Sequence, residues 1–199
     1  MFNLTDKTPA NVPEIDLKLK PEFANKIFYQ PEPIRSTADQ AIIDRNAADF
    51  ISANRAYFNP FSRHNIGQVI VHHFDKAGAP IVGRERVCLH LIPVNKCLEH
   101  FEFPIPKIES ILQKLMMYSV FSELDLAEGF NQLRVSKALQ QIFTFTYSNR
   151  KVSLKVLPLG VFWATSIFQS SMYMCDLFIA LLITRCLQIY VDNLGVHSD

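Results

Sequence analysis

Two acidic residues stand where chemistry on phosphates would need them. Asp125 lies in the segment Phe-Ser-Glu-Leu-Asp-Leu at 121–126, and Asp192 lies in Gln-Ile-Tyr-Val-Asp-Asn at 188–193. We expect these hydrophobic segments to be neighbouring strands of one sheet, so that their carboxylates can share divalent cations. Two such ions about 3.5–4 Å apart stabilise the attacking and leaving oxygens of phosphoryl transfer, and magnesium keeps positions open for phosphates. The alternative is that each aspartate merely ends a strand or caps a turn.

The composition predicts a folded chain without a global electrostatic field. Of the 199 residues, 49% are hydrophobic and 16 are Phe, which is enough apolar material for a core and excludes wholesale disorder. Lys and Arg number 20 and Asp and Glu number 19, so the net charge is only +1. Any site for a polyanion must therefore be local.

The cysteines and the hydropathy pattern indicate an intracellular setting. The four cysteines show no Cys-x-x-Cys spacing, and no secretory signal opens the chain. The most apolar run, at 177–183, is far shorter than the roughly 20 residues that a bilayer core requires. We therefore expect a protein of the cytoplasm or nucleus that has no membrane-spanning segment.

The elements that must position the two aspartates follow from residue patterning. The five prolines within residues 1–35 predict an extended arm, in which only 15–19 alternates like an edge strand. Ser36 or Thr37 can serve as the N-cap of a helix that we expect to run to Asn54. Segments 68–74 and 86–92 are typical of two strands joined by a hairpin loop.

The second half of the chain mixes strands with separated helices, which favours an α+β fold. An apolar stripe predicts a helix at 108–115, and Ser166 begins a longer helix with Ile167, Phe168, Cys175 and Phe178 facing inward. A turn is expected at 193–195. Further strands are expected at 120–126, 130–135, 142–147, 152–157, 185–192 and 196–198.

The amino-acid sequence around the two aspartates indicates a protein family more specifically than their spacing does. Segment 121–135, Phe-Ser-Glu-Leu-Asp-Leu-Ala-Glu-Gly-Phe-Asn-Gln-Leu-Arg-Val, closely resembles the first catalytic motif of reverse transcriptases of LTR retrotransposons and retroviruses. Segment 190–193, Tyr-Val-Asp-Asn, resembles the family's Tyr-x-Asp-Asp signature with its second Asp replaced. Segments 104–112, 157–160 and 164–172 also match in the family's order. The resemblance covers roughly residues 59–199.

The resemblance implies a fold of fingers and palm, with the palm an antiparallel sheet packed on helices and the thumb absent from this chain. It assigns 1–35 to the arm, 36–100 and 133–163 to the two parts of the fingers, and 101–132 and 164–199 to the two parts of the palm. We expect the family's primer-gripping hairpin, thumb, connection and RNase H parts to lie beyond residue 199.

The resemblance also implies a metal and nucleotide site. Asp125 and Asp192 would be the catalytic metal ligands for Mg²⁺ or Mn²⁺, and the Leu126 carbonyl and Asn193 would complete the metal site. Phe130 matches the aromatic steric gate, whose flat ring leaves no room for a 2′-hydroxyl. Arg86 matches a fingers arginine that holds the incoming triphosphate, for which a planar, always-charged fork is suited.

Four positions match family contacts to the template and primer. They are Pro158, Gly160, Gln169 and Tyr190. Pro158 and Gly160 belong to the loop that lies against the template in the family.

The chain departs from the family pattern at several of these positions. His73 stands where a triphosphate-binding lysine is expected, and a histidine is largely neutral near pH 7. His90 and Ile92 replace an Asp and an Arg. Asn193 replaces a carboxylate with a neutral amide, which removes one negative charge from a site for two dications.

The function implied is RNA-directed DNA polymerisation, in which dNTPs are added to a primer 3′-hydroxyl on an RNA or DNA template. Because of Asn193, His73 and the missing thumb, we expect this chain to be weak or inactive. One alternative is a non-catalytic remnant that binds nucleic acid or a partner through cations of the fingers. Another is a gene remnant without function. The candidate cations are Arg63, Lys76, Arg84, Arg86 and Lys96.

Overall fold

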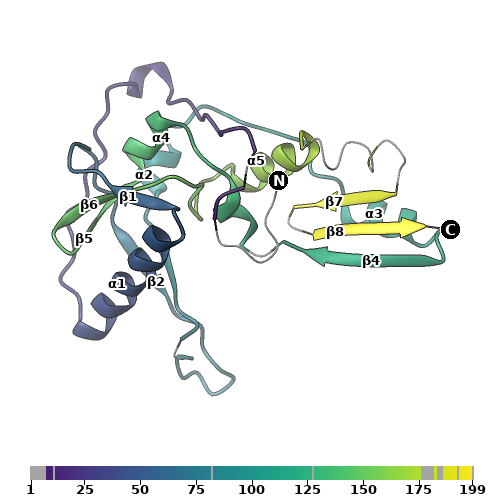
Figure 1. The fold of residues 1–199 in the computed structure, drawn as a ribbon, viewed down its shortest axis with the longest axis horizontal. Helices are drawn as coiled ribbons and strands as arrows, with labels where there is room; N and C mark the ends of the chain where they lie inside the picture. Colours follow the sequence, from purple (N-terminus) through teal and green to yellow (C-terminus); the bar gives the residue numbers. More distant parts are fainter. Residues whose placement is uncertain are drawn as a thin grey trace.

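The fold places two small sheets at one end of an elongated molecule and a third sheet at the other (Figure 1). The computed structural model describes residues 8–10, 12–81, 83–126, 128–175, 182, 186–191 and 193–198. Within these ranges the strands pair in the orders β1-β6-β5, β2-β3 and β4-β8-β7, all antiparallel. The strands are β1 (Ala56–Phe58), β2 (Gln68–Val71), β3 (Arg86–Leu89), β4 (Val120–Asp125), β5 (Thr144–Tyr147), β6 (Arg150–Leu154), β7 (Leu187–Tyr190) and β8 (Asn193–Ser198).

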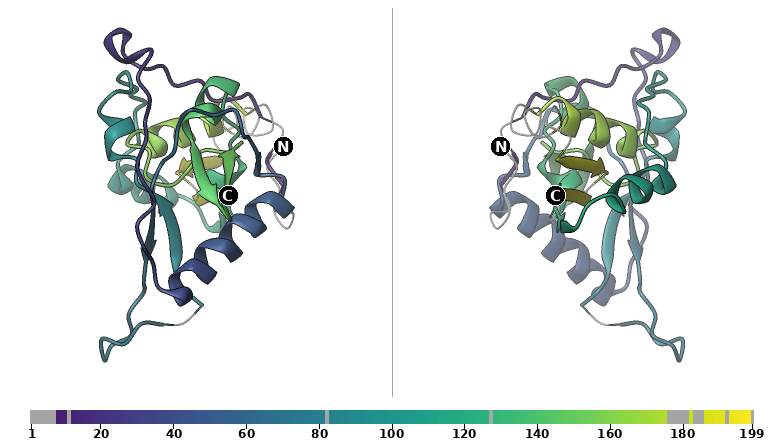
Figure 2. Two further views of the ribbon diagram at one scale, coloured as in Figure 1. Left: turned by 90° about the vertical axis from the view of Figure 1, so that its left-hand side faces the viewer. Right: turned by 90° about the vertical axis from the view of Figure 1, so that its right-hand side faces the viewer.

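Helices lie around and between the sheets. The longest, α1, begins after Ser36, whose hydroxyl accepts a hydrogen bond from the Asp39 N–H at 3.1 Å, as the N-cap prediction required. The hairpin connection between β2 and β3 projects beyond α1 in both views of Figure 2. The helices are η1 (Pro21–Phe23), α1 (Thr37–Ser52), α2 (Ile92–Asn95), α3 (Ile108–Leu115), η2 (Gly129–Gln132), α4 (Lys137–Ile142) and α5 (Ala164–Tyr173). No helix among the described residues is long and apolar enough to span a bilayer.

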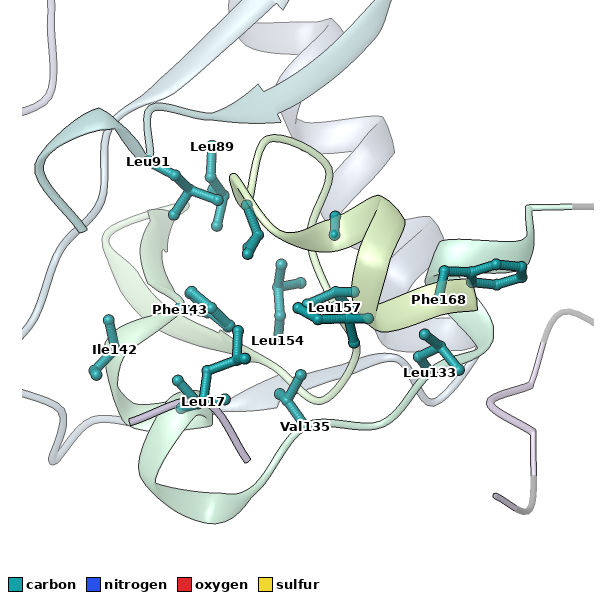
Figure 3. Packing of buried hydrophobic residues seen from close by; sticks show 14 of the residues in the cluster. Leu17, Leu89, Leu91, Leu133, Val135, Ile142, Phe143, Leu154, Leu157 and Phe168 are labelled. Carbon is teal, nitrogen blue, oxygen red and sulfur yellow. The ribbon is translucent and has the colours of Figure 1, made fainter. Parts of the chain in front are cut away.

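One continuous apolar core joins the two ends of the molecule. Phe143, Leu157 and Phe168 are fully buried in it; Figure 3 shows Phe143 and Leu157 between the first sheet and α5, and Phe168 on the opposite side of α5. Ile189 and Leu194 carry the core into the third sheet. None of the four cysteines, all of which lie within the described ranges, forms a disulfide bond.

The third sheet corrects the expected strand order. We expected the strand ending at Asp192 to lie beside β4, but β8 lies between β4 and β7. All six residues of β8 pair with β4 and four of them pair with β7, Asn193 lying opposite Asp125 on one side and opposite Tyr190 on the other. The chain therefore reverses before residue 193, and the turn expected at 193–195 is part of a strand.

Three other local expectations differ from the structure in whole or in part. Segment 130–135 is not a strand but a 3-10 helix, η2, followed by isolated bridges of Arg134 and Val135. The strand expected at 142–147 is confirmed as β5 but begins two residues later, because α4, capped by the Ser136 hydroxyl at the Leu139 N–H, extends to Ile142. Segment 15–19 makes two isolated bridges, through Ile15 and Leu19, instead of an edge strand. Phe178, expected on the inner face of the long helix, lies outside the described residues.

The arm binds along the outside of the molecule from its middle to α1 (Figure 1). Its Ile15 N–H donates to the Arg134 carbonyl at 2.8 Å, and its Lys20 N–H donates to the Cys97 carbonyl at 2.8 Å. Further along, the Phe28 N–H donates to Nδ1 of His64 at 3.1 Å. The arm therefore forms hydrogen bonds with the segments that follow η2, α2 and β1.

The contact of His64 predicts a pH dependence of stability. Burial, followed by the charges of Lys151 and Arg63, lowers the pKa of His64 below its ordinary value of 6.5. Nδ1 must stay unprotonated to accept the Phe28 N–H, whereas the unfolded chain takes up a proton near its ordinary pKa. Stability from this group is therefore complete above pH 6.5 and is lost as the pH falls toward the lower pKa of the folded state. We expect His64→Asn, whose amide oxygen can accept the same bond, to reduce the decline in urea midpoint between pH 7 and pH 5. An equal decline in both proteins would contradict this account.

Candidate active site

A cavity of about 530 Å³ lies where the first two sheets meet the third. Helix α1 and strand β3 form one wall, and the end of β4, η2 and the loop after β6 form the other. It brings together residues that lie far apart in the chain. Among them are Arg86, Asp125, Leu126, Glu128, Phe130 and Pro158.

The catalytic candidate Asp125 is the last residue of β4, and it is exposed to the cavity. Residues directly opposite in an antiparallel pair place their side chains on the same face with Cβ atoms about 4.5–5.5 Å apart. Asn193 is opposite Asp125, so its amide lies on the same face of the sheet as the carboxylate. Asp192 lies outside the described residues. The neighbouring candidate Leu126 is buried, with only 4% of its surface exposed.

The oxygen donors at this edge suit a hard cation. A carboxylate and a side-chain amide are ligands that Mg²⁺ and Mn²⁺ accept. No group of three or more His, Cys, Asp or Glu side chains that could hold a metal ion is found among the described residues. A metal at Asp125 would therefore need Asp192, the bound nucleotide or water to complete its shell.

Phe130 lies at the floor of the cavity because η2 packs on α5. Its ring centroid is 5.0 Å from that of Phe168, which is fully buried. Gly129 makes this contact possible, since a Cβ there would lie 2.8 Å from Cζ of Phe168. A side chain at position 129 would push the 3-10 helix off α5.

The two candidates from the fingers have different positions. Arg86, the first residue of β3, lines the cavity. His73 does not line it, and lies beyond β2 in the projecting hairpin, where its carbonyl accepts the Ile81 N–H at 2.7 Å. The structure therefore brings Arg86 together with Asp125 and leaves His73 apart from them.

The candidates for template contact are also divided. Pro158 lines the cavity, whereas Gly160, with φ +100°, lies outside it. Asn95, which the sequence analysis did not single out, fixes this loop: its Nδ2 donates to the Gly160 carbonyl at 2.8 Å, and its Oδ1 accepts the Phe162 N–H at 3.0 Å. The contacts of Pro158 and Gly160 with a template stay predictions.

Gln169 serves the protein interior in this structure. It is fully buried; its Nε2 donates to the Ile189 carbonyl at 3.0 Å and its Oε1 accepts the Val191 N–H at 2.6 Å. Both bonds fix the β7 end of the hairpin that carries half-buried Tyr190. With its amide used in this way, Gln169 positions the hairpin, and direct contacts of Gln169 and Tyr190 with nucleic acid stay predictions.

Two further carboxylates line the cavity. Glu85 accepts the Gly83 N–H at 3.0 Å, and this bond is the main reason why its pKa is lowered. Arg45 of α1 lies 3.5 Å from it. Glu128 is paired with Arg55. Together with Asp125 they are the carboxylates of the cavity lining, which also contains the cationic Arg86.

Comparison with known proteins agrees with this geometry. A family model described as "Reverse transcriptase (RNA-dependent DNA polymerase)" matches residues 84–199. The genome polyprotein of Petunia vein clearing virus is 28% identical over 127 residues, which cover 64% of this chain and 6% of that protein. The retrovirus-related Pol polyprotein from transposon 412 of Drosophila melanogaster is 34% identical over 87 residues, which cover 44% of this chain and 7% of that protein.

A solved structure extends the likeness to the fold. The foamy viral protease-reverse transcriptase in complex with an RNA/DNA hybrid matches with a TM-score of 0.73 and 18% sequence identity. The match covers 96% of this chain and 24% of that one. The likeness confirms the expected α+β architecture of fingers and palm. The chain thus spans a small part of each of these relatives.

The bonds of Gln169 lead to a test of how the hairpin is held. Gln169→Leu removes one donor and one acceptor from buried backbone groups, and we expect a loss of about 1–3 kcal/mol in the free energy of unfolding. Hydrogen exchange at the amides of β7 and β8 should accelerate more than in the first sheet. Gln140→Leu is the matched control, because Gln140 is equally buried but donates to the Val135 carbonyl at 2.8 Å. If both variants, or neither, selectively accelerate exchange in β7 and β8, the result would contradict the role of Gln169 in holding this hairpin.

Proposed function

Because the chain belongs to the reverse transcriptase family, we propose that its cavity is the nucleotide and metal site of an RNA-directed DNA polymerase. The observation that carries the proposal is the convergence of Arg86, Asp125 and Phe130 on one cavity from β3, β4 and η2. The relatives are polyproteins of a virus and a transposon, which supports a retroelement as the origin of the domain. We place its activity inside the cell, in the cytoplasm or nucleus.

The reaction proposed is attack of a primer 3′-hydroxyl on the α-phosphate of a dNTP, with pyrophosphate leaving. Divalent metal, when bound, stabilises the attacking and leaving oxygens. Asp125 would hold it together with Asp192, and the Asn193 amide and the Leu126 carbonyl would contribute oxygen. Arg86 would orient the triphosphate by paired N–H donors.

Phe130 would select the sugar. Its ring lies against Phe168 and cannot move toward α5, so its cavity face is a fixed wall. A flat ring beneath the sugar leaves space for a hydrogen at C2′ but not for a hydroxyl. The domain would then prefer DNA precursors to RNA precursors.

The template-primer is proposed to be RNA or an RNA/DNA hybrid, in line with the foamy viral structure, which holds an RNA/DNA hybrid. Pro158 lines the cavity, which supports a position of the template beside the nucleotide.

Two substitutions favour a second candidate, a nucleic-acid-binding module without catalysis. Asn193 places a neutral amide opposite Asp125, and His73 lies outside the cavity where the family resemblance expects a lysine for the triphosphate. Binding through surface cations of the fingers would survive both changes, since it depends on counterion release.

Primer extension separates the two candidates. We expect the wild-type chain to extend an oligo(dT) primer on poly(rA) little or not at all with Mg²⁺ or Mn²⁺, because Asn193 supplies no carboxylate opposite Asp125 and His73 lies outside the cavity. The variant Asn193→Asp should extend at least about tenfold more, since a second carboxylate opposite Asp125 would help to hold the metal ions that stabilise the attacking and leaving oxygens. Adding Asp125→Asn to that variant should abolish the gain.

The outcomes are distinct. Extension that persists with Asp125→Asn would show that the proposed centre is not the source of activity. Salt-dependent binding of poly(rA)/oligo(dT) without extension by any variant would support the binding module. Robust extension by the wild type would show that Asn193 and His73 do not impair the site.

A further inference from the structure

A buried arginine lies directly behind the nucleotide cavity. Arg55 precedes β1 and is only 3% exposed. Its backbone is held on both sides, because its N–H donates to the Phe50 carbonyl at 2.8 Å and its carbonyl accepts the Lys155 N–H at 2.7 Å. The guanidinium carbon lies 6.0 Å from the centroid of the Phe50 ring. Arg55 is thus a rigid point of the fold rather than a surface cation.

The guanidinium of Arg55 donates through Nη1 to the carboxylate of Glu128. Glu128 lines the cavity, with 46% of its side chain exposed. The backbone of Glu128 is left-handed, with φ 50° and ψ 42°, a conformation that glycine adopts freely but that the Cβ of other residues opposes. A glutamate at this position therefore needs an interaction that compensates for the unfavourable conformation.

The turn at Glu128 determines where the following residues lie. The Glu128 carbonyl accepts the Asn131 N–H at 2.9 Å and so begins η2. Gly129 and Phe130 come next, and Gly129 has no space to shift toward Phe168. The position of the Phe130 ring in the cavity thus depends on the backbone of Glu128, and that backbone is tied through its side chain to Arg55.

We propose that Arg55 is a positioning residue for sugar selection: by pairing with Glu128 it holds the left-handed turn that places Phe130 beneath the nucleotide. This inference rests on the proposed function of the cavity. Arg55 does not itself line the cavity, and its side chain is 4% exposed, so it acts through Glu128 and not on the triphosphate.

Two variants and one control test the anchoring. Arg55→Met removes the charge while keeping an apolar chain in the buried position, and it leaves a carboxylate that water can reach. We expect hydrogen exchange at the amides of 129–131 to accelerate about tenfold or more relative to the rest of the chain. Arg55→Met/Glu128→Gly should restore slow exchange, because glycine adopts the left-handed turn without an anchor. Arg45→Met, which removes the ion pair between the exposed Arg45 side chain and Glu85 on the other wall, should leave exchange at 129–131 unchanged.

The functional readout is the ratio of affinities for dATP and ATP. Saturation-transfer NMR titrations with Mg²⁺ should show preference for dATP in the wild type, a ratio reduced at least threefold in Arg55→Met, and recovery in the double variant. If Arg55 bound the triphosphate directly, Arg55→Met would weaken both nucleotides equally and the double variant would not recover.

The remaining outcomes are decisive as well. Unchanged exchange and an unchanged ratio in Arg55→Met would overturn the proposal. If neither Arg55→Met nor the double variant folds, Arg55 is required for folding alone and the proposal fails. If the wild type binds neither nucleotide, the proposed function fails and sugar selection with it, whereas the exchange measurement still decides whether Arg55 holds the turn.

Discussion

The contact between Phe168 and Gly129 is the constraint on which the site depends. Phe168 is fully buried on α5, and its ring leaves no space for a side chain at position 129, so η2 lies against the helix and Phe130 faces the cavity. The next residue of the same helix, Gln169, bonds to Ile189 and Val191 and holds the β7 end of the hairpin. Two consecutive residues of α5 thus contact both η2 and the β7 end of the hairpin. A displacement of this helix would move the proposed sugar wall and the proposed metal site together.

The charges of the cavity follow from the same arrangement. Asp125, Glu85 and Glu128 surround a space that also receives Arg86, and two of these carboxylates have an arginine partner, Arg45 for Glu85 and Arg55 for Glu128. Asp125 has no ion pair among those found for the described residues, which suits a carboxylate that would bind a metal. Opposite it, Asn193 supplies an oxygen without a charge. If this edge of the sheet holds a cation as proposed, Asp125 is the one charged ligand of the facing pair.

Motifs and local patterning predicted which residues form the site better than they predicted the contacts that hold those residues in place. One cavity is lined by Asp125, Arg86, Phe130 and Pro158. The sequence could identify these residues because each matches a family position that a short stretch of sequence specifies. The position of β8 beside β4 and the interior role of Gln169 depend on pairings across 20 or more residues, and η2 packs on Phe168 of the distant helix α5. Arg55 and Glu128 are 73 residues apart, and neither carries a pattern that indicates its partner. Periodicity does not register such contacts, so only the three-dimensional structure reveals them.

The central claim is that Asp125 and residue 193 face one cation, and calorimetric titration of Mn²⁺ tests it most directly. An added unit charge at about 4 Å contributes about 4 kcal/mol at an effective dielectric near 20, and hydration and screening remove most of this. We therefore predict that Asn193→Asp binds Mn²⁺ about tenfold more tightly than the wild type, which corresponds to roughly 1.4 kcal/mol. Asp125→Asn should bind more weakly than the wild type. Equal affinities in all three proteins would show that this edge of the sheet does not hold the metal.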